Sequence, residues 1–117
     1  MKNYFSPDEL KCKCGCGLNN FSPILLSFIN EIRRVKGHPL MVTSGCRCPM
    51  HNTTEGGKPT SDHITGEGID LKALTSRDRF IIIHTALSLG ITRVGIAKTF
   101  IHLGINAKNP QMVIWRY

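Results

Sequence analysis

The sequence lacks the features that would place the chain in a membrane. No apolar run reaches the roughly 18 residues of a membrane-spanning helix, so we expect no membrane span. The N-terminus has no apolar stretch of the signal-peptide kind, and we therefore expect synthesis in the cytoplasm without a signal peptide. Internal repeats, low-complexity segments and linkers are also missing, and a chain of 117 residues then predicts a single domain over residues 1–117.

Acidic residues are scarce: 8 Asp and Glu stand against 15 Lys and Arg, which gives a net charge of +7. Such a surface attracts polyanions, including nucleic acid and the phosphate-bearing polymers of a bacterial envelope. The basic residues are scattered, however, without a long run and without interleaved aromatic side chains. We therefore expect no nucleic-acid partner, and nucleic-acid binding is the weakest of three functional hypotheses.

The number of cysteines is odd, so the five thiols cannot all pair within the chain. Three alternate with other residues over positions 12–16, and two do so over positions 46–48. Zinc sites favour two to four residues between paired cysteines, and this alternate spacing fits them poorly. We expect unpaired thiols here, with a second metal site as the alternative.

Capping signals predict the helices. Ser6 and Ser22 each precede a proline, which is typical of an N-cap followed by the first helical residue. The second of these helices carries an apolar stripe at helical spacing and should end at Gly37. Thr75 begins a further capping pattern, which predicts a helix through Leu89.

Short apolar runs predict strands over residues 40–43, 68–71, 91–97, 100–105 and 112–117. Residues 44–68 between the first two are rich in Gly, Ser, Thr, Pro and Asn. A loop of this length in a small domain is usually functional or disordered, and its polar side chains favour function. Early helices followed by late strands indicate an α+β domain, built on a small antiparallel sheet with helices packed on one side.

One group of polar residues stands where the long loop enters its strand. His63 ends the loop, and Asp70 lies on the strand that follows. His102 lies on a later strand between apolar and small neighbours, an unusual setting for an imidazole. Two imidazoles, one carboxylate and an open position for water are typical of a catalytic zinc site. Spacing alone leaves a buried polar network without metal as the alternative.

Several motifs in order carry a resemblance to a known family. They are FSPDEL over residues 5–10, SGCRCPMHN over 44–52, GG at 56–57, SDHITGEGIDL over 61–71 and FIH at 100–102. Together they resemble the D-Ala-D-Ala carboxypeptidase family of zinc peptidases. That family shares its fold with the hedgehog signalling domain and includes phage endolysins that cut L-Ala-D-Glu bonds.

The resemblance implies a role for particular residues. His63, Asp70 and His102 match the three metal ligands, which implies one Zn²⁺ per chain. Arg47 matches the arginine that faces the site, where it would stabilise an oxyanion or hold a substrate carboxylate. Ser61 matches a serine that forms a hydrogen bond with the substrate.

The resemblance also implies the leading functional hypothesis. It is a zinc-dependent peptidase that hydrolyses an amide bond in the peptide part of bacterial peptidoglycan, by attack of zinc-bound water. The partner would be the peptidoglycan stem peptide, and the protein would be a monomer. A phage lysin or a tail-associated wall peptidase fits the small size and basic surface.

One departure from the family pattern concerns the general base. Relatives place a carboxylate either three residues before the last histidine or two residues after it, and here these positions are Thr99 and Gly104. Glu67 is our preferred substitute because it lies between two ligands, with Asp62 and Glu55 as alternatives. A missing base favours the second hypothesis, a zinc-containing, catalytically weak or inactive module that binds cell-wall peptide.

Overall fold

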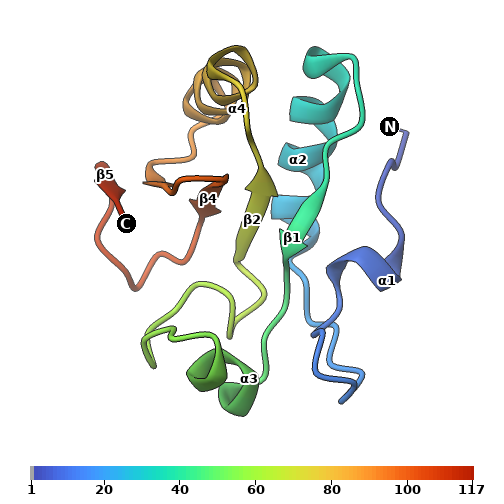
Figure 1. Cartoon of the computed structure of the whole chain (residues 1–117), viewed down its shortest axis with the longest axis vertical. Coiled ribbons are helices and arrows are strands. Elements are labelled where there is room, and N and C mark those ends of the chain that lie inside the picture. Colours follow the sequence, from blue (N-terminus) through green and yellow to red (C-terminus); the bar gives the residue numbers. More distant parts are fainter. Residues whose placement is uncertain (1) are drawn as a thin grey trace.

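A computed structural model describes residues 2–117 and shows helices packed against one five-stranded sheet (Figure 1). This confirms the α+β class. The elements follow the chain in the order α1 Pro7–Leu10, α2 Pro23–Lys36, β1 Val42–Ser44, α3 Pro49–Thr54, β2 Gly68–Lys72, α4 Ser76–Ser88, β3 Arg93–Ile96, β4 Phe100–Gly104 and β5 Val113–Arg116.

The predicted caps begin the helices as expected. The side chain of Ser6 accepts a hydrogen bond from the backbone of Glu9, which completes a capping box at α1. Ser22 and Thr75 accept corresponding bonds from the first turns of α2 and α4. Within residues 2–117, no helix combines the length and the apolar character that crossing a membrane requires.

The sheet has the strand order β1-β2-β4-β3-β5, and its strands are antiparallel except for one pair. The expectation of a purely antiparallel sheet is wrong for β5, which runs parallel to β3. Both edges of β4 are already paired, with β2 and β3. The chain reverses direction after β4 and joins the outer edge of β3. Since β3 is antiparallel to β4, the returning strand is parallel to β3.

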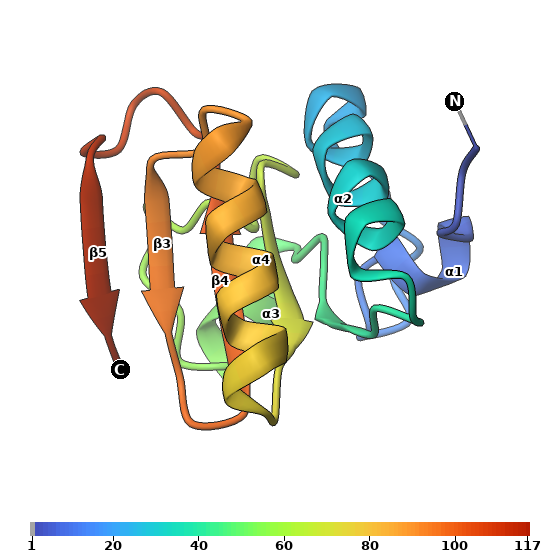
Figure 2. The same cartoon turned by 90° about the horizontal axis from the view of Figure 1, so that it is seen from above.

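The hydrophobic core lies on one face of the sheet, under α2 and α4, which pack side by side (Figure 2). Buried side chains of the two helices meet inward-pointing strand residues, among them Leu25, Ile29, Ile32, Ile82, Ile69, Leu71, Val94, Ile101 and Leu103. Alternate strand residues point to the opposite face. Asp70 and His102 are therefore directed away from the helices, toward α3 and the long loop.

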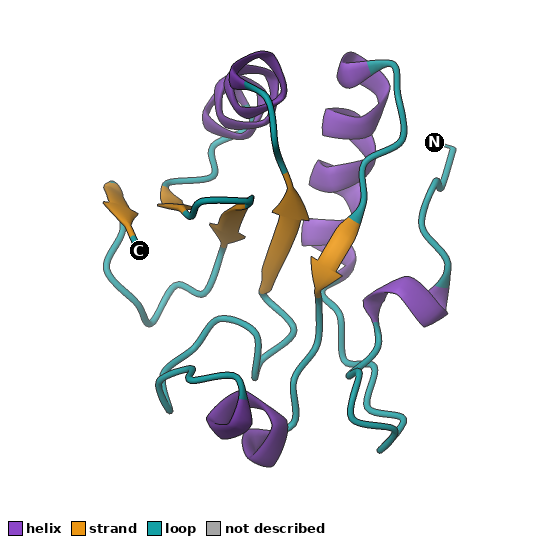
Figure 3. Cartoon of the chain, in the orientation of Figure 1, coloured by secondary structure: helices purple, strands orange, loops and turns teal. Residues whose placement is uncertain are grey.

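The long polar stretch between β1 and β2 holds a short helix that the sequence did not predict. Helix α3 is capped by Cys48, whose sulfur accepts from the backbone N–H of His51 at 3.4 Å. Cysteine is a weak capping signal, so composition alone predicted only a loop. The rest of the stretch is loop, as expected, and it lies beyond the C-terminal end of β1 and the N-terminal end of β2 (Figure 3).

Candidate metal centre

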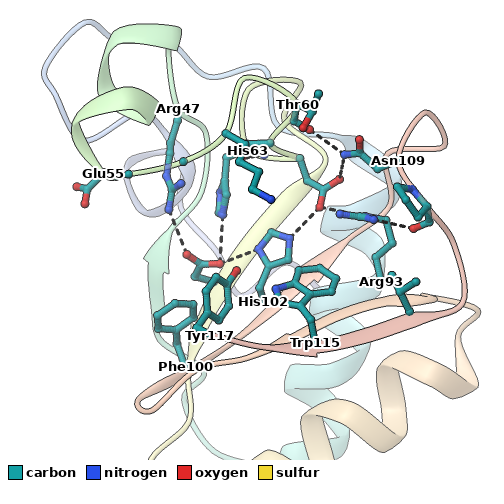
Figure 4. A pocket seen from close by; sticks show the side chains of 18 residues that line it. Arg47, Glu55, Thr60, His63, Arg93, Phe100, His102, Asn109, Trp115 and Tyr117 are labelled. Atoms are coloured by element: carbon teal, nitrogen blue, oxygen red, sulfur yellow. Dashed lines mark hydrogen bonds and ion pairs between the residues drawn. The ribbon is translucent and has the colours of Figure 1, made fainter.

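The pairing of β2 with β4 sets Asp70 directly opposite His102, and the long loop delivers His63 to the same point. Asp70 Oδ1 lies 2.8 Å from His102 Nδ1 and 3.2 Å from His63 Nε2. All three side chains are buried. The structure thus brings the three predicted ligands together. In Figure 4 the side chains of His63, His102 and Arg47 point toward one carboxylate, which their contacts identify as that of Asp70.

The outer nitrogen of each imidazole has a partner that fixes the ring. His63 Nδ1 lies 2.7 Å from the carbonyl oxygen of Gly45, which can only accept, so Nδ1 donates and Nε2 is the nitrogen that faces Asp70. His102 Nε2 donates to Asp62 Oδ2 at 2.9 Å, which leaves Nδ1 to face Asp70. Such outer partners are typical of histidines that bind zinc.

The donor set fits one zinc ion. His63, Asp70 and His102 each offer one ligand atom, and these atoms all lie within 4.8 Å of one another. Two nitrogens and one carboxylate oxygen are a common set for catalytic zinc, with the fourth position open. The site is therefore suited to zinc in both the chemistry and the orientation of its ligands.

The charges of the site depend on one another. Burial would raise the pKa of Asp70, but hydrogen bonds with His102 and His63 hold it well below its usual range. Burial would lower the pKa of His102, but hydrogen bonds with Asp62 and Asp70 raise it above its ordinary value. Without a metal, the triad therefore favours a proton on His102, and a bound cation has to displace it.

Asp62 holds His102 in place, a role that the sequence did not reveal. Its carboxylate is buried, and Oδ2 accepts from His102 Nε2 at 2.9 Å and from Arg93 Nε at 3.2 Å. Oδ1 accepts from Asn109 Nδ2 at 2.9 Å. Since both oxygens are engaged on the far side of the imidazole, Asp62 is placed to orient a ligand and not to act as a general base.

Gly104 explains how Asp62 reaches that position. A Cβ atom added at Gly104 would lie 2.1 Å from Asp62 Oδ2, far closer than any packing contact. The Asp62 carboxylate thus occupies the space that a side chain at position 104 would need. Position 104 is one of the two positions at which relatives have a carboxylate. In this chain it is a glycine, and the carboxylate of Asp62, from the long loop, occupies the space beside it.

Arg47 lies beside the triad and is held by three partners. One guanidinium nitrogen donates to Asp70 Oδ2 at 3.2 Å, on the carboxylate oxygen that faces away from the histidines. The others donate to Ser44 Oγ at 2.9 Å and Asn52 Oδ1 at 3.3 Å. Arg47 therefore presents a fixed cation at the pocket and also steadies a predicted ligand.

Ser61 and Glu67 have different placements. Ser61 lines the pocket, and its hydroxyl accepts from the backbone N–H of His63 at 3.2 Å. Glu67 lines a separate, smaller groove with residues such as Ser22. Because side chains alternate along a strand, Glu67 points with Ile69 to the face opposite Asp70. This corrects our expectation that Glu67 could serve as general base, since the structure does not bring it to the site.

The triad lies at the floor of an open cavity of about 690 Å³. One wall is aromatic, formed by Phe100, Trp115 and Tyr117, and the ring of Trp115 lies 5.6 Å from that of His102 (Figure 4). The loop over residues 55–61 contributes much of the rest. The sequence did not reveal this wall, and its only signal there is the alternation of Trp115 and Tyr117 at the end of the chain.

The family model described as Peptidase M15 matches residues 3–104. The matched range contains all three candidate ligands together with Arg47 and Ser61, and it ends before the strand that carries Trp115. A comparison with curated proteins finds no match for the chain.

Proposed function

Because this chain belongs to the peptidase M15 family, we propose that it is a zinc peptidase that hydrolyses an amide bond in the peptide part of bacterial peptidoglycan. One observation carries the proposal. One nitrogen of each imidazole and one carboxylate oxygen converge at the floor of an open cavity. A site for a structural metal would instead be closed on all sides by protein ligands.

His63, Asp70 and His102 would hold the zinc ion. When bound, zinc supplies Lewis acidity, polarises the carbonyl under attack and lowers the pKa of a coordinated water to about 7. Gly45 and Asp62 keep the two imidazoles in the orientation that such binding requires.

Arg47 and the aromatic wall would position the peptide. The guanidinium of Arg47 is planar and fixed, which suits a carboxylate of the stem peptide or the oxyanion that forms during hydrolysis. Trp115 and Tyr117 offer an apolar surface opposite it. The net charge of +7 would also draw the protein toward the anionic polymers of a cell wall.

The pocket offers few candidates for the general base. Asp70 is a ligand and Asp62 orients His102, so Glu55 is the remaining carboxylate among the pocket residues that the structure describes. It lies at the rim, half exposed, 3.4 Å from His51 Nε2. We assign the proton transfer to Glu55. An exposed carboxylate that contacts His51 is a weak general base, which favours slow turnover. This supports a second candidate function, a zinc-containing module that binds wall peptide with little cleavage.

The test is to incubate zinc-loaded protein with purified peptidoglycan and to analyse the muropeptides by mass spectrometry. New stem-peptide fragments that are absent with the His102→Ala variant would support the peptidase. Sedimentation with the wall without new fragments would support the binding module. If the protein neither cleaves nor sediments with peptidoglycan, the proposed substrate is wrong.

A further inference from the structure

Four of the five cysteines gather at one place, three from the loop after α1 and one from the segment that precedes α3. Cys12, Cys14, Cys16 and Cys48 have sulfur atoms that all lie within 4.8 Å of one another. The sulfurs of Cys12 and Cys14 are 3.5 Å apart, and those of Cys14 and Cys48 are 3.7 Å apart. All four thiols are free in residues 2–117, and a disulfide would need a separation of about 2.05 Å.

These separations are those of sulfurs around a single tetrahedral ion. With zinc–sulfur bonds of about 2.3 Å, the ligands of a tetrahedral site are roughly 3.8 Å apart. We propose that Cys12, Cys14, Cys16 and Cys48 bind a second zinc ion in a closed, structural site. The proposal replaces our expectation of one zinc per chain and of thiols without a metal.

The local backbone shows why the alternate spacing is not an obstacle. Gly15 and Gly17 have φ angles of +90° and +81°, a conformation that side chains disfavour. They turn the chain sharply between and after the cysteines. The turn is closed by a hydrogen bond of 2.8 Å from Cys12 N to the carbonyl oxygen of Leu18. Three thiols can thus face one point although only one residue separates each pair.

The fourth ligand arrives from the segment that precedes α3. The backbone N–H of Cys46 donates to the carbonyl oxygen of Leu10 at 2.8 Å, which joins this segment to the end of α1. The N–H of Cys48 lies 3.4 Å from Cys12 Sγ, a contact that is common around thiolates. Cys12 is buried, whereas Cys14 and Cys16 are exposed, so an ion can enter from solvent and be enclosed.

The cysteine site would affect the pocket through Arg47. Arg47 stands between Cys46 and Cys48, and its side chain donates to Asp70. A zinc ion on Cys48 would join the N-terminal loop to the segment that presents Arg47. Its structural effect would therefore be to fix the position of the pocket's cation.

The metal content of protein purified under reducing conditions tests the proposal. We expect two zinc ions per chain in the wild type and one in a Cys14→Ser, Cys16→Ser double variant. Cys46→Ser is the matched control, because Cys46 is buried but lies outside the cluster, with its sulfur 3.7 Å from Asn19 Oδ1. That control should keep two ions. Iron in place of the second zinc would overturn the assignment of the metal.

Cobalt substitution separates this site from the pocket. Thiolate ligands give tetrahedral Co²⁺ an intense charge-transfer band in the near ultraviolet, and imidazole and carboxylate ligands do not. His102→Ala should keep this band and one metal ion, so the proposal remains testable even if the double cysteine variant fails to fold. A wild type with one metal ion and no charge-transfer band would overturn the proposal.

Discussion

The pocket triad and the cysteine cluster differ in the kind of backbone that carries their side chains and in how many ligand atoms they bring together. The pocket triad lies largely on paired strands, and protein partners orient both of its imidazoles. The cysteine cluster lies on loops, and two of its four sulfurs are exposed. The triad has three ligand atoms beside an open cavity, whereas the cysteine cluster has four ligand atoms that lie close to one another.

The difference teaches what each ion would do. Protein partners already orient the imidazoles of the triad, so a metal bound there would contribute to catalysis more than to folding. The cysteines lie outside the helices and strands, and there a metal would add structure by joining two loops. Four experiments, ordered by the size of the expected effect, test this division.

The largest effect should come from His102→Ala. Removing one of three ligands should abolish zinc binding in the pocket and reduce peptidoglycan cleavage to background, while the cysteine zinc remains. Elemental analysis and muropeptide mass spectrometry measure the two effects. If the variant keeps the full zinc content of the wild type, the assignment of His102 as a ligand is wrong.

Arg47→Lys should come next, with activity lower by about 10²-fold, the scale of one lost oxyanion donor. Lysine keeps the charge but cannot donate to Asp70, Ser44 and Asn52 at once from a planar group. Both zinc ions should remain, as judged by elemental analysis. A variant that unfolds at a much lower temperature would show that Arg47 mainly braces the fold.

Asp62→Asn should weaken zinc binding in the pocket by about 10- to 100-fold, as loss of an outer partner typically does. The side chain keeps its shape but loses the charge that faces His102 and Arg93. Competition with a chelator measures the affinity. Gly104→Ala should act in the same direction, because its methyl group would displace Asp62. An unchanged affinity in both variants would contradict the role of Asp62.

The smallest effect should come from Glu67→Gln. Its side chain lines a groove on another face, so activity and zinc content should change by less than about twofold. The matched variant is Glu55→Gln, which changes the carboxylate at the pocket rim. A Glu67→Gln variant without activity, beside an active Glu55→Gln, would restore Glu67 as the base.

The sequence predicted the features that depend on local signals. Ser6, Ser22 and Thr75 cap their helices as their positions suggested, and the apolar runs became strands. The position of Glu67 shows where this fails. Proximity in sequence favoured it as a base, but its side chain lines a separate groove and not the pocket.

Features that depend on distant partners were beyond prediction. The parallel pairing of β5 follows from its place beside β3, and the local sequence of β5 does not select that edge of the sheet. The cysteine cluster joins residues 34 positions apart, and the spacing within each group suggested no metal. The aromatic wall likewise forms because β5 lies beside β3.

The close fit of Gly104 to Asp62 has a consequence for the history of this sequence. Any side chain at position 104 would occupy the place of the Asp62 carboxylate, so the two positions cannot have changed independently. With a larger residue at 104, an aspartate at 62 would have to leave its position beside His102. Homologues should therefore divide into two groups, those with glycine at 104 beside an acidic residue at 62 and those with neither, and intermediates between them should be rare.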